Sequence, residues 1–324
     1  MPAVIRVHKT GGPEVLTYED LPTARPGPGE VVLRQYACGV NYIDTYYRSG
    51  LYSAGAMPFT LGAEGAGEVI GLGEGVSQLK LGDRVAYSAS TGGYAQERVF
   101  AADRLVRLPD AISYEQAAGM MLKGMTARYL VRKTFAVGKG HTVLVQAAAG
   151  GVGLLLCQWA KALGATVIGT VGSEAKAALA RENGADHTIL YRSEDWVARV
   201  KDLTDGRKCD VVYDGVGKAT YPGSLDCLRP LGTWVTFGNA SGPVEPVPVL
   251  TLMQKGSLFA TRPTLTHYVA RREDLVETAT DLFDMVASGK VKIPVNQRYA
   301  LEDARAAHEH LEARETTGSS ILIP

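Results

Sequence analysis

The stretch from His141 to Gly164 reads HTVLVQAAAGGVGLLLCQWAKALG, and it decides the fold. Its first part, from Thr142 to Val145, is a short apolar run typical of a buried parallel strand. A turn of small residues follows at 147–153, and apolar residues then recur at helical spacing up to Gly164, which is placed to end the helix. A strand, a glycine turn and a helix in this order predict a phosphate site, because small residues admit a pyrophosphate and a helix N-terminus offers N–H donors.

The glycine pattern is imperfect, which leaves an ordinary tight turn as the alternative. The pattern G-x-G-x-x-G would place glycines at 148, 150 and 153, and position 148 is alanine. The next apolar run, 165–171, predicts a second strand and completes a strand–helix–strand unit. The sequence therefore predicts a dinucleotide site and redox chemistry. The turn residues expected at this site are Ala149, Gly150, Gly151 and Val152.

The end of the second predicted strand indicates which dinucleotide binds. NAD sites place a carboxylate there, whereas this strand ends in Gly172 and Ser173, with Lys176 close behind. A cation without a carboxylate favours a 2′-phosphate and hence NADPH, unless Lys176 is merely a solvated helix residue. Glu174 is the competing feature, and its other role is an acid that complements the dipole of the next helix. Tyr191, which should close the third strand, is expected either to flank the adenosine or to lie on the surface.

Composition fits a globular chain of about two domains. The chain has 324 residues, 46% hydrophobic and 21% charged. Its 34 basic residues balance 34 acidic ones, so no global field draws it to nucleic acid or a membrane, and no run approaches the roughly 20 apolar residues of a membrane span. The four cysteines lack C-x-x-C spacing, and the N-terminus lacks the apolar core of a signal peptide. We therefore expect a cytoplasmic protein with reduced thiols.

Sequence patterns divide the chain into three segments. Residues 1–124 are rich in predicted strands, residues 125–261 alternate strands and helices, and residues 262–324 resume mixed structure and are expected to return to the first domain. The alternation predicts an α/β fold: a β-rich domain plus a Rossmann-type domain with a doubly wound parallel sheet. The run from Gly256 to Ala260 is expected to be an apolar edge strand. Pairing of this strand with its copy would make a homodimer.

Several short stretches along the whole chain match one family. They lie at 11–16, 41–52, 62–67, 80–85, 148–153, 237–239 and 318–320. Together they resemble the medium-chain dehydrogenase/reductase superfamily, and in detail its quinone oxidoreductase (zeta-crystallin-like) branch. The resemblance implies a GroES-like catalytic domain, a Rossmann domain and an active site in the cleft between them. It also implies NADPH-dependent reduction of a quinone by a homodimer.

No metal is expected at this site. Zinc-dependent relatives carry a cysteine where this chain has Asn41 and a histidine where it has Ala63, and neither replacement binds zinc. Glu64 remains, but one carboxylate does not hold a catalytic zinc. His308 and His310 should point to different sides of a predicted helix, so both are expected at the surface. Alcohol oxidation is not expected, because no Lewis acid would stabilise the alkoxide.

The resemblance also implies the residues near the reacting quinone. They are Asn41, Tyr46, Tyr52 and Thr126, and a donor among them would stabilise charge developing on the carbonyl oxygen. Packing is the alternative role of the two tyrosines. Asn41 and Thr126 are also expected to contact the cofactor, and Thr126 is expected to open the helix that enters the nucleotide domain, where it could instead cap that helix. Asp44 is expected either to relay a proton or to cap a helix.

Three further residues are expected at the cofactor by the same resemblance. Phe237 and Asn239 should lie at the end of a strand of the parallel sheet, where ligands of such sheets bind. Arg314 is expected in the last helix, close to the adenosine phosphate. The alternatives are a turn-forming asparagine and a solvated arginine.

Two rival functions stay open at this point. The first is an NADPH-dependent alkenal or enone reductase, which would share the fold and the cofactor. The second is an NADPH-binding structural or RNA-binding protein without turnover. The zero net charge and the absence of a basic stripe make nucleic acid an unexpected partner.

Overall fold

The computed structural model describes residues 1–324 and divides them into two compact units. The first unit comprises Met1–Lys123, Arg271–Ala287 and Ile293–Pro324. The second unit comprises Gly124–Ala270 and Ser288–Lys292. The domain ranges expected from the sequence differ from these units, because residues 262–270 and 288–292 pack within the second unit. Those ranges stay predictions.

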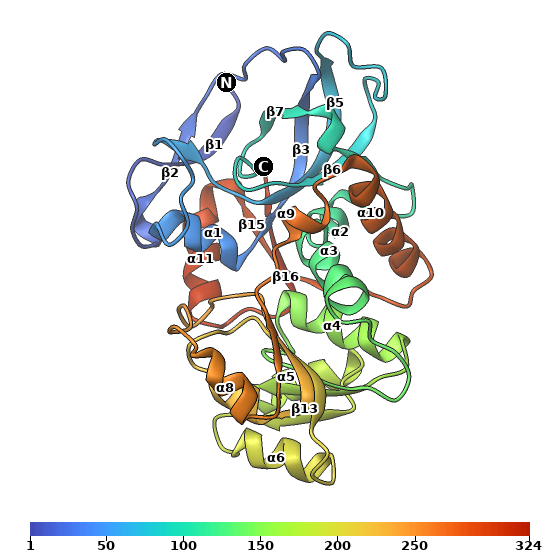
Figure 1. Ribbon diagram of the computed structural model, residues 1–324. Helices are drawn as coiled ribbons and strands as arrows, with labels where there is room; N and C mark the ends of the chain where they lie inside the picture. The colour runs from blue at the N-terminus through green and yellow to red at the C-terminus, as the bar shows by residue number, and fades with distance from the viewer. The chain divides into compact units, whose positions relative to one another are not determined.

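The second unit is built on a six-stranded parallel sheet, coloured green to orange in Figure 1. The strand order is β11-β10-β9-β12-β13-β14. The strands are β9 (Thr142–Val145), β10 (Thr166–Val171), β11 (His187–Leu190), β12 (Cys209–Asp214), β13 (Leu228–Thr236) and β14 (Phe259–Thr261). The chain runs outward from β9 in one direction and from β12 in the other, which confirms the predicted doubly wound fold.

Helices precede, connect and follow these strands. They are α3 (Met121–Tyr129), which starts in the first unit, the short π-helix η3 (Leu130–Thr134), α4 (Gly151–Ala162), α5 (Glu174–Glu182), α6 (Trp196–Leu203), α7 (Gly223–Asp226), α8 (Val249–Gln254) and α9 (Leu265–Tyr268). Helix α4 packs on β9 and β10, and α5 packs on β10 and β11. No helix of the chain combines the length and the apolar character that a membrane span needs.

Several boundaries in the second unit differ from the prediction. Sequence periodicity predicts a helix at 193–203, whereas α6 begins at Trp196, because the Asp195 carboxylate accepts hydrogen bonds from two N–H groups of the first turn and so caps the helix. Sequence periodicity also predicts a helix at 221–228, and the structure forms only the shorter α7 there. Strand β14 begins at Phe259 because Gly256 and Ser257 adopt φ angles of 115° and 54°, which no strand accommodates.

The first unit holds two sheets. The strands of the larger one are β15 (Val295–Ala300), β16 (Ser319–Ile323), β3 (Glu30–Val40), β5 (Glu64–Leu72), β6 (Arg84–Ser88) and β8 (Val106–Arg107), in that order, with β7 (Glu97–Ala101) also paired to β3. The smaller one joins β1 (Ala3–Val7) to β2 (Leu16–Asp20) and β4 (Phe59–Thr60). The apolar run at 320–323 predicts a C-terminal strand, and this strand is present as β16, which lies antiparallel to β3.

The helices of the first unit are short except for α10. They are η1 (Pro13–Val15), α1 (Tyr42–Ser49), η2 (Ala102–Arg104), α2 (Tyr114–Ala118), α10 (Arg272–Ala287), η4 (Leu301–Asp303) and α11 (Ala304–Glu312). Helix α11 packs on η1, so the C-terminal helix contacts the N-terminal part of the chain.

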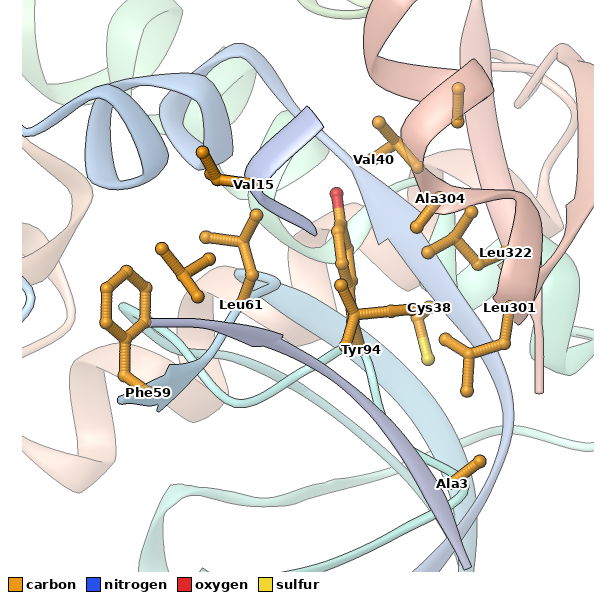
Figure 2. Close-up of a cluster of buried hydrophobic side chains, with 13 residues drawn as sticks. Ala3, Val15, Cys38, Val40, Phe59, Leu61, Tyr94, Leu301, Ala304 and Leu322 are labelled. Atoms are coloured by element: carbon orange, nitrogen blue, oxygen red, sulfur yellow. The ribbon is translucent and has the colours of Figure 1, made fainter. Parts of the chain in front are cut away.

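A buried apolar cluster joins the two ends of the chain in the first unit (Figure 2). It draws Ala3 from β1, Val40 from β3 and Leu322 from β16 around the ring of Tyr94. Fully burying a side chain such as leucine stabilises a fold by roughly 1.5–3 kcal/mol. The cluster therefore holds the end of β3 firmly, and the segment that starts at Asn41 follows directly from it.

Candidate functional site

The glycine turn between β9 and α4 has the geometry of an anion cradle. Gly150 is the residue before the helix, and α4 begins at Gly151. At Gly153 the backbone is crowded, because a Cβ atom there would lie 2.3 Å from the carbonyl oxygen of Ala147. The first N–H groups of a helix have no partner within it, so Gly151 and Val152 offer donors at this turn.

The missing first glycine of the pattern is compensated from the neighbouring strand. Ala148 is fully buried beside Gly169 on β10. A Cβ atom at Gly169 would lie 2.6 Å from the Cβ atom of Ala148. The methyl group therefore occupies space that Gly169 leaves open, and the turn keeps its close packing without a glycine at position 148.

The end of β10 gathers the residues expected to choose between NADP and NAD. Ser173 caps α5 by accepting a hydrogen bond from the Lys176 N–H, and Glu174 is the first residue of that helix, as predicted. The hydroxyl of Tyr191 lies over the strand end, 2.9 Å from where a Cβ atom of Gly172 would be. These residues therefore form one cluster.

Arg192 belongs to the same strand end, and sequence reasoning missed it. Its Nε atom lies 3.5 Å from the position that a Cβ atom of Gly172 would take. The available signal was its place directly after Tyr191, at the end of a strand that pairs with β10. Arg192 brings a second cation close to a strand end that carries no carboxylate.

Phe237 and Asn239 follow β13 and pack against the segment after β12. The Phe237 N–H donates to the Asp214 carbonyl at 2.8 Å, and its ring covers Gly215. Asn239 turns the chain, since its carbonyl accepts from the Gly242 N–H at 2.9 Å. Both residues therefore lie at the carboxyl edge of the sheet that also carries the glycine turn.

A buried polar chain ties the carboxyl ends of three strands together. The Thr170 hydroxyl donates to Gln146 at 2.6 Å, the Gln146 amide donates to Ser224 at 3.2 Å, and the Ser224 hydroxyl donates to Asp214 at 2.8 Å. All four side chains are buried. Such fully bonded networks rigidify the structure around them, so the edge that carries the glycine turn is held in one arrangement.

In the first unit, Asn41 stands between β3 and α1. Its N–H donates to the Asp44 carboxylate at 2.8 Å, so Asp44 takes the helix-capping role of its two expected alternatives. Tyr46 lies on the same helix, and its ring centroid is 5.2 Å from that of Tyr52. The Tyr52 N–H donates to the Tyr46 carbonyl at 3.0 Å. The fold thus brings Asn41, Tyr46 and Tyr52 onto one helix and the loop that follows it.

Glu64 and Lys123 form a buried ion pair beside Asn41. The Lys123 Nζ atom lies 2.7 Å from Glu64 Oε1, and the Asn41 Nδ2 atom donates to the same oxygen at 2.9 Å. The Leu122 N–H donates to the other oxygen at 2.6 Å. Sequence reasoning considered Glu64 only as a metal ligand and missed Lys123, because nothing local in the chain joins the two.

Two expected site residues occupy other places than predicted. Thr126 lies in the middle of α3 and cannot cap it, because the helix starts five residues earlier at Met121, where Glu64 accepts the Leu122 N–H. Arg314 lies beyond the end of α11, with φ 61°, and the Arg314 N–H donates to Leu311 as the helix closes. Thr126 belongs to the second unit and Arg314 to the first.

The prediction that His308 lies at the surface is wrong, whereas His310 is exposed. His308 is fully buried, and the Arg48 guanidinium donates to its Nδ1 atom at 2.8 Å. Its Nε2 atom therefore carries the hydrogen and faces the Tyr94 hydroxyl at 3.1 Å. Tyr94 in turn donates to Asp44 at 2.8 Å. Burial, and then the charge of Arg48, lower the pKa of His308 to about 3.

Comparison with known proteins places this site in context. A family model described as an alcohol dehydrogenase GroES-like domain matches residues 27–137, and one described as a zinc-binding dehydrogenase matches residues 151–285. A quinone oxidoreductase of Pseudomonas aeruginosa is 55% identical over 97% of both chains. The crystal structure of Escherichia coli quinone oxidoreductase complexed with NADPH is 50% identical, covers 99% of this chain and 100% of its own, and superposes with a TM-score of 0.97. A 2-haloacrylate reductase of Burkholderia is 44% identical over 98% of both chains.

Proposed function

This chain belongs to the quinone oxidoreductases of the medium-chain dehydrogenase/reductase superfamily, and from that premise we propose that it reduces quinones with NADPH. The observation that carries the proposal is the identity of 50–55% with three quinone oxidoreductases over nearly the whole chain. Function on a shared fold depends on the site, so the residues must also suit the cofactor and the reaction.

The residues of the second unit suit a dinucleotide. The crowded backbone at Gly153 leaves no room for a side chain, and the start of α4 offers N–H donors for a pyrophosphate. We assign the pyrophosphate contacts to Ala149, Gly150, Gly151 and Val152. Phe237 and Asn239, at the carboxyl edge of the same sheet, are assigned to the nicotinamide side of the cofactor.

The end of β10 suits a 2′-phosphate. Gly172 and Ser173 leave space there, Tyr191 covers it, and the cations Lys176 and Arg192 belong to the segments that form it. Glu174 starts α5, where a carboxylate complements the helix dipole, which leaves the ribose phosphate to the cations. Arg314, an exposed residue of the first unit, is retained as a proposed contact of the adenosine phosphate.

The reaction requires little covalent chemistry from the protein. When bound, the reduced nicotinamide supplies the hydride, and a proton from the site or from water completes the hydroquinone. The chain's own task is to orient the acceptor and to stabilise charge on its oxygen. We assign this task to Asn41, Tyr46 and Tyr52 in the first unit and Thr126 in the second.

A reductase of activated alkenes is the second candidate. The observation that favours it is the 44% identity with a 2-haloacrylate reductase over 98% of both chains. An electron-poor alkene accepts a hydride at carbon and needs the same polarisation of its carbonyl oxygen. The two functions therefore differ only in the acceptor.

We also propose a homodimer joined at β14. This strand ends the six-stranded sheet, and Phe259 on it is 61% exposed. Other large apolar side chains are exposed on the neighbouring segments, namely Leu231, Val249, Leu250 and Met253. An unpaired edge with exposed apolar residues favours pairing with its copy.

We propose the cytoplasm as the compartment. All four cysteines, Cys38, Cys157, Cys209 and Cys227, are free and buried. Free thiols are typical of a reducing environment, and disulfides are common in secreted proteins.

Steady-state oxidation of NADPH by the purified chain tests the proposed function. The acceptors are para-benzoquinone, phenanthrenequinone and 2-haloacrylate, each measured with and without a metal chelator. We expect quinone-dependent turnover that the chelator leaves unchanged. Turnover of 2-haloacrylate alone would assign the chain to the second candidate function, and tight NADPH binding without any turnover would overturn both.

A further inference from the structure

The strand order of the second unit has its topological switch point between β9 and β12. From β9 the sheet continues to β10 and β11 on one side, and from β12 it continues to β13 and β14 on the other. Ligands of such sheets bind at the switch point, beyond the carboxyl ends of the strands. The glycine turn follows β9, and residues 215–218 follow β12. These two segments therefore flank the place where a dinucleotide is expected to bind.

The segment after β12 carries the residues assigned to the nicotinamide side. The Phe237 N–H donates to the Asp214 carbonyl at 2.8 Å, and the Ser241 N–H donates to the Val216 carbonyl at 2.8 Å. The ring of Phe237 also covers Gly215. A shift of the segment after β12 would therefore move Phe237 and the residues that follow it.

The carboxylate of Asp214 fixes the conformation of this segment. It is fully buried. Its Oδ1 atom accepts hydrogen bonds from the Val216 N–H at 2.9 Å and the Gly217 N–H at 3.1 Å. The hydroxyls of Thr220 and Ser224 donate to its Oδ2 atom, each at 2.8 Å. Every lost bond would leave a buried polar group without its partner, so the segment is held in one conformation.

A chain of hydrogen bonds runs from the glycine turn to this carboxylate. The Ala147 N–H donates to the Thr170 hydroxyl at 3.3 Å, which donates to Gln146 at 2.6 Å. The Gln146 amide donates to the Ser224 hydroxyl at 3.2 Å. An ionised carboxylate only accepts hydrogen bonds, so Ser224 must donate to Asp214 and accept from Gln146. The chain therefore has one polarity, and reversing a link would place two acceptors in contact.

We propose that Gln146, Ser224 and Asp214 are positioning residues that hold the nicotinamide side of the cofactor site in place relative to the glycine turn. The inference rests on the proposed function and deepens it. These residues act through the backbone of the two segments and not by touching the cofactor. The whole dinucleotide reaches both segments, whereas its adenosine half reaches only the glycine turn and the end of β10. Binding of NADPH therefore depends on the chain of hydrogen bonds, and binding of the adenosine half does not.

Ser224→Ala opens the chain at its central link and tests this difference. Isothermal titration calorimetry measures the Kd of NADPH and of adenosine 2′,5′-bisphosphate. We expect the Kd of NADPH to rise roughly 2- to 30-fold, since residues that couple two sites without touching the ligand change affinity by that much. The Kd of the bisphosphate should not change. Equal weakening of both ligands, or no change in either, would overturn the inference. A wild-type chain that binds neither ligand would count against the proposed function instead.

A second pair of variants serves if Ser224→Ala does not fold. Thr170→Val keeps the shape of the side chain and removes the hydroxyl, which opens the chain beside the glycine turn. Thr170→Ser keeps the hydroxyl. We expect Thr170→Val to weaken NADPH more than the bisphosphate, and Thr170→Ser to bind both ligands like the wild type. An equal loss of NADPH affinity in the two variants would show that packing and not the hydrogen bond is responsible, which contradicts the inference.

Thr204→Ala is the matched control within the same unit. The Thr204 hydroxyl donates to the Val200 carbonyl at 2.8 Å and accepts the Lys208 N–H at 2.9 Å. Thr204 follows α6 and precedes β12, so it lies toward the amino edge of the sheet, opposite to the glycine turn. Thermal unfolding should show lower stability for Thr204→Ala, while both Kd values stay unchanged. A rise in the Kd of NADPH equal to that in Ser224→Ala would assign the effect to lost stability and overturn the inference.

Discussion

Asp44 and His308 are two buried titratable residues that share one hydrogen-bonded neighbour, Tyr94. Burial raises the pKa of Asp44 to about 7, although the hydrogen bonds from Tyr94 and Asn41 and the charge of Lys123 oppose it. The Asp44 Oδ1 atom has no hydrogen-bond partner. The His308 pKa moves in the opposite direction. Near pH 5 the folded chain therefore holds a proton on Asp44 and none on His308, and the unfolded chain does the reverse.

The two shifts predict opposite dependences of stability on pH. The raised pKa of Asp44 gives stability that is complete below its ordinary value of 3.8 and is lost as the pH rises to about 7. The lowered pKa of His308 gives stability that is lost as the pH falls from 6.5 to about 3. The slopes cancel where the two windows overlap. We expect His308→Gln to lose stability with rising pH in this window, and Asp44→Asn to lose it with falling pH, each by about 1.4 kcal/mol per pH unit at most.

Urea unfolding of the two variants across the overlapping window checks this prediction. The difference in unfolding free energy between each variant and the wild type should change with pH, with opposite sign for the two. Curves parallel to that of the wild type would show that one or both residues keep ordinary pKa values in the folded chain.

Lys176 decides the cofactor preference in our account. Lys176→Glu should lower kcat/KM for NADPH by roughly 10- to 100-fold, because a charge-assisted contact with the 2′-phosphate is replaced by repulsion. The value for NADH should change little. Steady-state rates with both cofactors measure the ratio, and Lys201→Glu on α6 serves as the control for a change of surface charge. An equal loss with both cofactors would contradict the assignment and return attention to Glu174.

Residue positions were predictable from the sequence where their partners are local. Gly172, Ser173 and Lys176 lie within five residues and form one cluster, as expected from the end of a strand and the start of a helix. His308 could not be placed in this way. Its partners Arg48 and Tyr94 are 260 and 214 residues away, and only the folded chain supplies the acceptor and donor that make its burial tolerable.

At the scale of elements, β10 and the glycine turn depend on each other through one pair of small residues. Gly169→Ala should destabilise the chain by about 1–3 kcal/mol, because the new methyl group collides with Ala148. Adding Ala148→Gly should recover most of this loss and produce the usual glycine pattern. Thermal unfolding of the two single variants and the double variant measures the coupling. Losses that merely add in the double variant would show that the two residues do not share the same space.

Helix and strand boundaries were predictable where periodicity and caps agree, as in β9, α4 and β10. The start of α3 was not predictable, and for this reason Thr126 was wrongly expected to open that helix. The residue that caps α3 is Glu64 from β5, and a cap from a distant strand leaves no trace in the local sequence. Arg314 shows the same limit, because the left-handed backbone that ends α11 is usually marked by a glycine or an asparagine.

At the scale of the whole molecule, the exposed edge of the second unit predicts self-association. Phe259→Glu should convert a dimer into a monomer, because a charge on the edge strand opposes pairing with its copy. Leu81→Glu is the matched control, since Leu81 is equally exposed, at 60%, but belongs to a turn of the first unit. Sedimentation velocity measures both variants. A monomeric wild type, or a dimeric Phe259→Glu, would rule out this interface.

The α/β fold and its parallel sheet could be predicted from the order of segments, because each strand–helix–strand unit has a hydrophobic pattern that is visible in a short stretch of sequence. The buried cluster of Glu64, Lys123 and Asn41 could not be predicted, since β5, α3 and the end of β3 meet only in the folded chain. The residues proposed for the cofactor therefore lie largely in one stretch of sequence, whereas those proposed for the acceptor come from distant parts of the chain.

Hydride transfer from NADPH to a quinone is measured in a stopped-flow single turnover with NADPH and para-benzoquinone, repeated with NADPH deuterated at the transferring position. We predict one hydroquinone formed per NADPH consumed, and a slower reaction with the deuterated cofactor. NADPH consumption that does not depend on the quinone, or that yields no hydroquinone, would contradict the account.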